Sequence, residues 1–185
     1  GKLMSGLSTD RARLQRLLDG AEGMAGLLKK VRRTLSLAPD EDESSLLQAA
    51  SMEDQFKGPE LHQVASAMLQ GGKTERRHGK AIMGWLAVPK DRMNYFDSYL
   101  AAFFTEQGKG KPYANPLTKK TMVAVPHGLE TINDEVERLE ALRHRRNGAR
   151  VVAATEMLLT LGAQLITRYE AAKRRQALLD YDLVL

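Results

Sequence analysis

Gly71, Gly72, Lys73 and Thr74 are the residues whose types and spacing come nearest to a known chemical motif. In a P-loop, Gly-Lys-Thr follows a glycine-rich turn whose backbone amides cradle phosphates, and the hydroxyl holds magnesium. The P-loop also requires a glycine five positions before Gly72, where this chain has Ala67, and a buried strand, where this chain has an amphipathic helical pattern. We therefore interpret the glycine pair as the end of one helix and Thr74 as the N-cap of the next.

The other reactive residue types form no catalytic or metal-binding constellation. The chain has no cysteine, which excludes a disulfide, a thiolate zinc site and a cysteine nucleophile. The acidic run from Asp40 to Glu43 lacks the ligand offsets of a calcium loop, and Ser44 and Ser45 lack the flanking glycines of a hydrolase nucleophile. We expect no catalytic residue, metal ligand or cofactor. The histidines show no i, i+4 pairing, so each is interpreted as a surface residue: His62, His78, His127 and His144.

Basic residues are concentrated in the second part of the chain. Residues 1–60 carry 9 basic and 10 acidic side chains, for a net charge of −1, whereas residues 61–185 carry 19 and 13, for a net charge of +6. Such clusters neutralise nucleic-acid phosphates, although a solvated helix face explains any single one equally well. The clusters are Lys73-Arg76-Arg77-Lys80, Lys109-Lys111-Lys119-Lys120, Arg143-Arg145-Arg146-Arg150 and Lys173-Arg174-Arg175.

The third cluster has a competing explanation within the same predicted helix. Glu135, Glu137 and Glu140 lie upstream of it and offer ion-pair partners along the helix. Pairing and phosphate binding therefore stay equally open for residues 143–150.

Length and composition indicate a soluble chain of the size of one ordinary domain or two very small ones. A chain of 185 residues with 43% hydrophobic content can bury a core, so intrinsic disorder is not expected. There is no uninterrupted run of about 18 apolar residues, and residues 1–4 lack the apolar core of a signal peptide. We expect a cytoplasmic chain without a membrane partner.

The apolar residues recur every three or four positions, which predicts an all-α fold. Proline and glycine place the expected helices near residues 9–20, 24–35, 46–50, 59–69, 74–88, 91–105 and 117–125. In the helix at 91–105, six large side chains share one face, and we interpret them as core, with a base-stacking platform as the alternative. They are Tyr95, Phe96, Tyr99, Leu100, Phe103 and Phe104.

A basic loop and a very long helix complete the expected fold. Residues 106–116 are rich in glycine and proline, and we expect them to form a mobile hairpin tip that carries Lys109 and Lys111. Residues 129–180 contain no proline, which predicts one very long helix or two helices broken near Asn147 and Gly148. The fold is thus an irregular multi-helix bundle in one domain, with small helices in 1–60, central helices in 61–128 and the long helix in 129–182.

A resemblance to a known family lies at the C-terminus. The string Tyr169-Glu170-Ala171-Ala172-Lys173-Arg174-Arg175-Gln176-Ala177-Leu178-Leu179-Asp180-Tyr181-Asp182 resembles the Y-x-x-x-K … L-D-Y/F-D-D-L stretch of UvrD-like superfamily 1 helicases, and within them the AddA branch of bacterial recombination helicase-nucleases. Residues 35–43, 71–74 and 99–103 are also similar to that branch. After Asp182 the family has a second aspartate where this chain has Leu183, so no role is carried onto that acid.

The resemblance implies that the chain is the inserted helical 1B subdomain of a larger ATP-dependent helicase-exonuclease. In that family the motif ends a long helix that leads back to the ATP-binding core. ATP, magnesium and the nuclease site are then implied for the parent protein and lie outside these residues. The implied partners are duplex or forked DNA, the remainder of the helicase chain and a second subunit of the AddB type, in the bacterial cytoplasm at the nucleoid.

Two functions are expected from these observations. The first is a non-catalytic subdomain that guides DNA during double-strand break repair. The alternative is a helical protein-interaction module that binds an acidic partner, and salt dependence separates the two. For the first, DNA contacts are expected at Lys109, Lys111, Arg143, Arg145, Arg146, Arg150, Lys173, Arg174 and Arg175.

Overall fold

The computed structural model describes the backbone of residues 23–182 and the side chains of residues 23–175. Within this range the chain is all-α, as predicted, and has no β-strand. It divides into two compact units, which we call the central unit, Glu43–Arg146, and the terminal unit, residues 23–42 with 147–182. These boundaries differ from the sequence divisions at residues 60 and 128. The helix expected at residues 9–20 lies outside the described residues.

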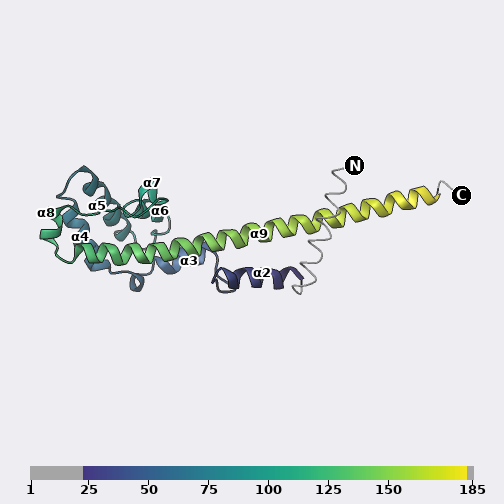
Figure 1. The fold of residues 1–185 in the computed structure, drawn as a ribbon, viewed down its shortest axis with the longest axis horizontal. Coiled ribbons are helices and arrows are strands. Elements are labelled where there is room, and N and C mark those ends of the chain that lie inside the picture. The colour runs from purple at the N-terminus through teal and green to yellow at the C-terminus, as the bar shows by residue number, and fades with distance from the viewer. Residues whose placement is uncertain (1–22, 183–185) are drawn as a thin grey trace. The chain divides into compact units, whose positions relative to one another are not determined.

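The central unit contains short helices that gather around the first part of the long helix α9, Gly128–Asp182 (Figure 1). Pro59 lies in the first turn of α4, where its missing N–H costs nothing. The glycines at 71 and 72 separate α4 from α5, and Gly72 rather than Thr74 occupies the N-cap position of α5. The other elements are α3 (Glu43–Ala50), η1 (Glu53–Gln55), α4 (Gly58–Met68), α5 (Lys73–Leu86), α6 (Phe96–Leu100), α7 (Thr105–Gly108) and α8 (Lys119–Ala124).

An aromatic cluster forms the core of the central unit, which confirms the core interpretation. Trp85 stacks on Tyr99 with ring centroids 4.0 Å apart, and Phe103 meets Tyr99 edge-on at 5.0 Å. Each of these side chains is almost fully buried. Offset and edge-on ring pairs add about 0.5–1.5 kcal/mol to the stabilisation from burial.

The single helix predicted over residues 91–105 is wrong, because only Phe96–Leu100 is helical. Residues 91–95 form turns, and Tyr95 is 51% exposed rather than part of the core. The carbonyl of Arg92 accepts a hydrogen bond from the Trp85 indole, and its guanidinium donates to the Ser51 carbonyl. These tertiary contacts fix the turn and override the helical period.

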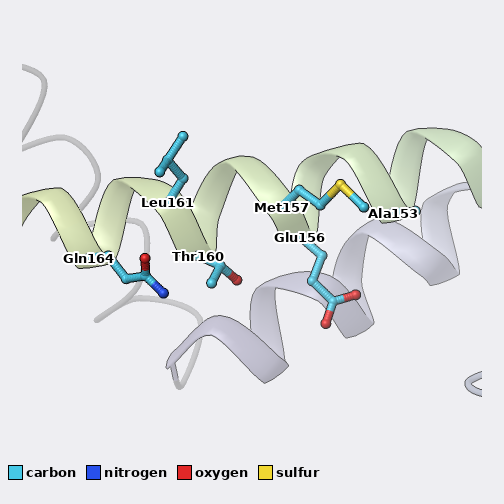
Figure 2. Close-up of a pocket in the computed structure, with 6 residues that line it drawn as sticks. All are labelled: Ala153, Glu156, Met157, Thr160, Leu161 and Gln164. Carbon is cyan, nitrogen blue, oxygen red and sulfur yellow. The ribbon is translucent and has the colours of Figure 1, made fainter.

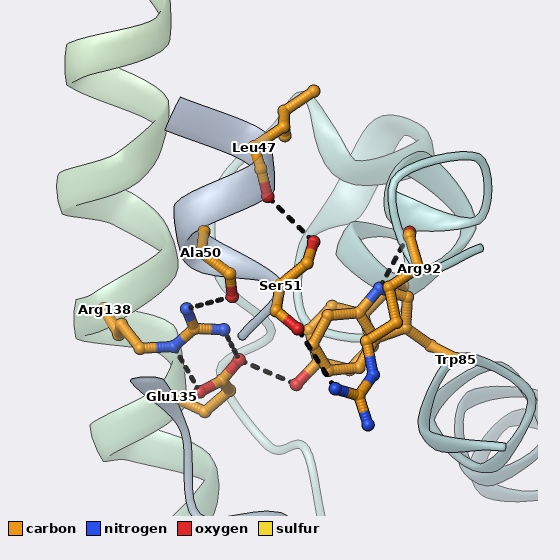
Figure 3. A network of polar contacts seen from close by, with 8 residues as sticks. Leu47, Ala50, Ser51, Trp85, Arg92, Glu135 and Arg138 are labelled. Carbon is orange, nitrogen blue, oxygen red and sulfur yellow. Dashed lines mark hydrogen bonds and ion pairs between the residues drawn. The ribbon is translucent and has the colours of Figure 1, made fainter. Parts of the chain in front are cut away.

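A buried polar network joins α9 to α3 and α6 (Figure 3). Glu135 forms two hydrogen bonds with the Arg138 guanidinium, at 2.6 and 2.8 Å, and accepts a third from the Tyr99 hydroxyl at 2.7 Å. Arg138 also donates to the Ala50 carbonyl at 3.1 Å. Because the carboxylate is paired and fully hydrogen-bonded, its burial is compensated.

In the terminal unit, α2 (Gly23–Thr34) runs antiparallel to residues 148–160 of α9. Leu35 approaches Gly148 closely, since a Cβ at Gly148 would lie 3.5 Å from that of Leu35. At the other end of α2, Met24 Sδ lies 3.7 Å from the Thr160 hydroxyl. The long helix is continuous through Asn147 and Gly148, which decides between the two predicted alternatives.

The same part of α9 exposes large apolar side chains. Met157 is 74% and Leu158 69% exposed, and Leu161 and Leu165 are also on the surface. Met157 and Leu161 help to line an open groove on the helix (Figure 2). By length and composition alone, α9 is the one helix among the described residues that matches a membrane span. Glu156, Gln164 and Arg168 interrupt this stretch, so it is not an uninterrupted apolar run.

Candidate nucleic-acid interface

The predicted basic loop is a hydrogen-bonded turn that begins and ends at a β-bridge between Phe104 and Pro112. Inside it, the Thr105 amide donates to the Lys111 carbonyl and the Gly110 amide donates to the Thr105 carbonyl, both at 2.9 Å. Glu106 and Gln107 adopt positive φ, which reverses the chain at some cost in strain. The turn leaves the Lys109 and Lys111 side chains exposed.

Arg143 reaches this loop from α9 and holds it. Its guanidinium donates to the carbonyls of Lys109 and Gly110, at 2.6 and 3.0 Å, and lies over the Phe104 ring, 4.5 Å from the centroid. The structure thus brings together three of the predicted DNA contacts, Lys109, Lys111 and Arg143. Because the Arg143 donors are directed at backbone carbonyls, Arg143 positions the two lysines.

Arg146 is buried, contrary to the exposure expected of a DNA contact. Only 8% of the residue is accessible, and its guanidinium pairs with Glu43 at 2.7 Å and Asp97 at 3.9 Å. It therefore joins α9 to α3 and α6. Ion pairing within α9 was the competing explanation for residues 143–150. Arg146 is ion-paired, but its partners lie on other helices, and Glu135 pairs with Arg138 instead.

The other predicted contacts are divided between the two units. Arg145 is exposed in the central unit, whereas Arg150 is exposed in the terminal unit. Of the motif residues, Tyr169 and Lys173 are exposed, and the side chains of Leu179, Asp180, Tyr181 and Asp182 lie outside the described ones. Arg174 and Arg175 are exposed next to Lys173 at the same end of α9.

His78 is buried, so its interpretation as a surface residue is wrong, whereas His62, His127 and His144 are exposed. The imidazole packs on the Tyr113 ring with centroids 4.6 Å apart. Burial, and then the neighbouring Arg77 charge, lower the pKa of His78, which favours the neutral ring. This ring pair fastens the chain after the basic loop to the side of α5.

A second contact fastens the same segment to the start of α5. Glu75 is buried, with only 5% of the residue accessible to solvent. It accepts hydrogen bonds from the Thr118 amide at 2.7 Å and from the Thr118 hydroxyl at 3.1 Å. Burial opposes ionisation, but the hydrogen bonds from Thr118 and Thr121 outweigh it and lower the pKa of Glu75. Thr118 in turn caps α8 by accepting from the Thr121 amide.

These two contacts unite basic clusters that are separate in the sequence. They lay residues 113–118 along α5, so the start of α8 lies beside the start of α5. The side chains on these elements are exposed: Lys73, Arg76, Arg77, Lys80, Lys119 and Lys120. In the sequence, the lack of any acidic residue in 76–90 and 107–129 indicates that both segments are basic but not that they meet.

Within the described residues, no group of three or more histidine, aspartate or glutamate side chains is placed to hold a metal ion. In comparisons with known proteins, no family model, curated protein or solved structure matches the chain.

Proposed function

We propose that the chain is a non-catalytic accessory subdomain that guides DNA for an ATP-dependent helicase-nuclease of the AddA type. The observation that carries the proposal is the loop on which Lys109 and Lys111 are exposed while Arg143 holds the loop backbone. The resemblance of residues 169–182 to the motif of that family and the +6 charge of residues 61–185 also support it. The remainder of the helicase chain would supply ATP hydrolysis, magnesium and movement.

The proposed mechanism is electrostatic guidance without bond making. Exposed ammonium groups neutralise phosphates and release condensed counterions, which is independent of base sequence and lets a protein slide along a duplex. A turn whose backbone is held by Arg143 loses little entropy on binding, because it is already ordered. DNA could therefore pass over Lys109 and Lys111 while the motor moves it.

Fluorescence anisotropy with a labelled forked duplex tests this proposal. We expect binding at about 50 mM salt that weakens steeply by 200 mM, because each neutralised phosphate contributes about −0.9 to the log–log slope. The double variant Lys109→Glu with Lys111→Glu should weaken DNA binding at least about tenfold. The control is Lys29→Glu with Lys90→Glu, which makes the same change in charge outside the loop. Binding by neither the native chain nor the variants at low salt would contradict the proposal.

A protein-interaction module is the second candidate, and the exposed apolar side chains of α9 favour it. Met157, Leu158, Leu161 and Leu165 form a surface that water does not solvate well. An interface built on them would depend little on salt. Partner binding that survives 200 mM salt but is lost in Leu158→Gln with Leu161→Gln would support this function.

A further inference from the structure

We infer that α5 and the segment that crosses it form one continuous phosphate-binding tract, and that Glu75 is the residue that positions it. We define the tract by its exposed cations, and the inference rests on the proposed function in naming DNA as the ligand. The tract comprises Lys73, Arg76, Arg77, Lys80, Lys119 and Lys120.

The first argument is charge. Glu75 is the one acidic residue of α5 and is buried, and α8 has none. Lys73, Lys80, Lys119 and Lys120 are exposed, and their ammonium groups form no hydrogen bond or ion pair with the part of the chain that the structure describes. The tract therefore presents cations that no neighbouring carboxylate in α5 or α8 neutralises at the surface.

The second argument is the buried clamp beneath these cations. Glu75 holds the first residue before α8 through two hydrogen bonds to Thr118, and its carboxylate also interacts with the Thr121 side chain and the Gly72 backbone N–H. Thr118 is followed directly by Lys119 and Lys120. Without the clamp, those two lysines would lose their fixed place near the start of α5.

The third argument concerns the chemistry and spacing of the ligand. Lys73 and Lys80 are seven residues apart on α5, about 10 Å along the helix axis, which is about three phosphates along one strand of a duplex. The exposed residues of α5 include no large apolar side chain. Because protein interfaces are anchored by buried aromatic or aliphatic side chains, this face fits a polyanionic backbone better than a folded acidic protein.

A charge-reversal pair tests the tract. In anisotropy measurements with a fully paired 20-base-pair duplex, Lys73→Glu with Lys119→Glu should weaken binding at least about tenfold and reduce the salt slope by about two. Lys29→Glu with Lys90→Glu is the matched control and should change binding less than twofold. If the native chain binds no DNA, both the tract and the proposed function are overturned. If it binds and the two pairs behave alike, the tract alone is overturned.

Two substitutions at Glu75 distinguish positioning from simple electrostatics. Glu75→Ala removes a negative charge, so a purely electrostatic role predicts tighter DNA binding, whereas loss of the clamp predicts binding weakened about fivefold or more. Glu75→Gln keeps an oxygen that accepts from the Thr118 amide and should bind at least as well as the native chain. Tighter binding by both variants would overturn the positioning role. Far-UV circular dichroism checks that each variant folds. If Glu75→Ala does not fold, Thr118→Val takes its place, and the same weakening of DNA binding is expected. Unchanged DNA binding by Thr118→Val would overturn the positioning role of Glu75.

A competitor decides between ligand classes. Poly-glutamate has the charge of an acidic protein but not the phosphate spacing, and we expect it to displace the duplex only at concentrations at least about tenfold higher than those of unlabelled duplex. Equal competition would overturn DNA as the ligand and favour an acidic protein partner.

Discussion

The central and terminal units contain the same kind of helix but are stabilised in different ways. In the central unit, aromatic rings fill a core and buried arginine and glutamate side chains are paired across helices. In the terminal unit, α2 covers one side of α9 while Leu158, Leu161 and Leu165 stay exposed. A period of three and four is therefore enough to form helices in both units, but only the central unit gathers its large aromatic side chains into a buried core.

The largest effect is expected from the core of the central unit. Trp85→Ala removes a fully buried ring that contacts Phe56, Phe96 and Tyr99, and should lower the free energy of unfolding by about 3–5 kcal/mol. Urea denaturation followed by far-UV circular dichroism measures it. Leu161→Ala in the terminal unit, which removes an exposed side chain, is the control and should change stability by less than about 0.5 kcal/mol. Similar losses of stability in Trp85→Ala and Leu161→Ala would contradict the contrast between the two units.

The continuity of α9 gives the next largest effect. Gly148→Pro places a ring in the helix interior and should cost about 3 kcal/mol, whereas a loop at this position would tolerate it. Gly148→Ala is the matched control. Its Cβ would meet Leu37 at 3.4 Å, an ordinary contact, so we expect no loss of stability and a gain of up to about 1 kcal/mol in helix propensity. Thermal denaturation followed at 222 nm compares the two variants.

The buried network of the central unit should show a pH dependence. Burial, and then the Glu135 charge, raise the pKa of Tyr99 well above its ordinary value of 10.0. Below pH 10 the neutral phenol is present in both states, and Tyr99→Phe should cost about 2 kcal/mol for the lost hydrogen bond to a carboxylate. As pH rises above 10, the unfolded tyrosine ionises first, so the native chain loses stability relative to the variant. Urea titrations at pH 8 and pH 10.5 measure the difference in free energy of unfolding between the native chain and Tyr99→Phe. An equal difference at the two pH values would show that ionisation of Tyr99 is not linked to folding.

The smallest effect on stability is expected on the exposed face of the terminal unit. Leu158→Gln with Leu161→Gln should leave the free energy of unfolding within about 0.5 kcal/mol per site of the native value, because these side chains are already in water. Urea denaturation followed by far-UV circular dichroism measures this difference. A loss of several kcal/mol would mean that this face is buried and would erase the contrast with the core.

The helices could be predicted from sequence where local signals agree with packing. The glycine pair at 71 and 72, Pro59 and the apolar periods place α2, α4, α5 and α8 close to their observed positions. Residues 91–105 could not be predicted, because the turn at Arg92 is fixed by Trp85 of the preceding helix and by Ser51, which is distant in sequence. A period cannot report such contacts.

The candidate site was predictable in composition but not in arrangement. The exposure of Lys109 and Lys111 follows from the polar, glycine-rich loop that carries them. The burial of Arg146 and His78 does not, because their partners Glu43, Asp97 and Tyr113 come from other elements. For the same reason, the union of two basic clusters by Glu75 and Thr118 is visible only in the fold.

Chemical acetylation of lysines with and without duplex DNA, read by mass spectrometry, tests the central claim most directly. The account predicts that DNA protects Lys73, Lys119 and Lys120 of the tract together with Lys109 and Lys111 of the loop, while Lys29 of α2 and Lys90 react equally in both conditions. Protection of Lys29 and Lys90 to the same extent, or no protection of Lys73 and Lys119 at saturating DNA, would contradict it.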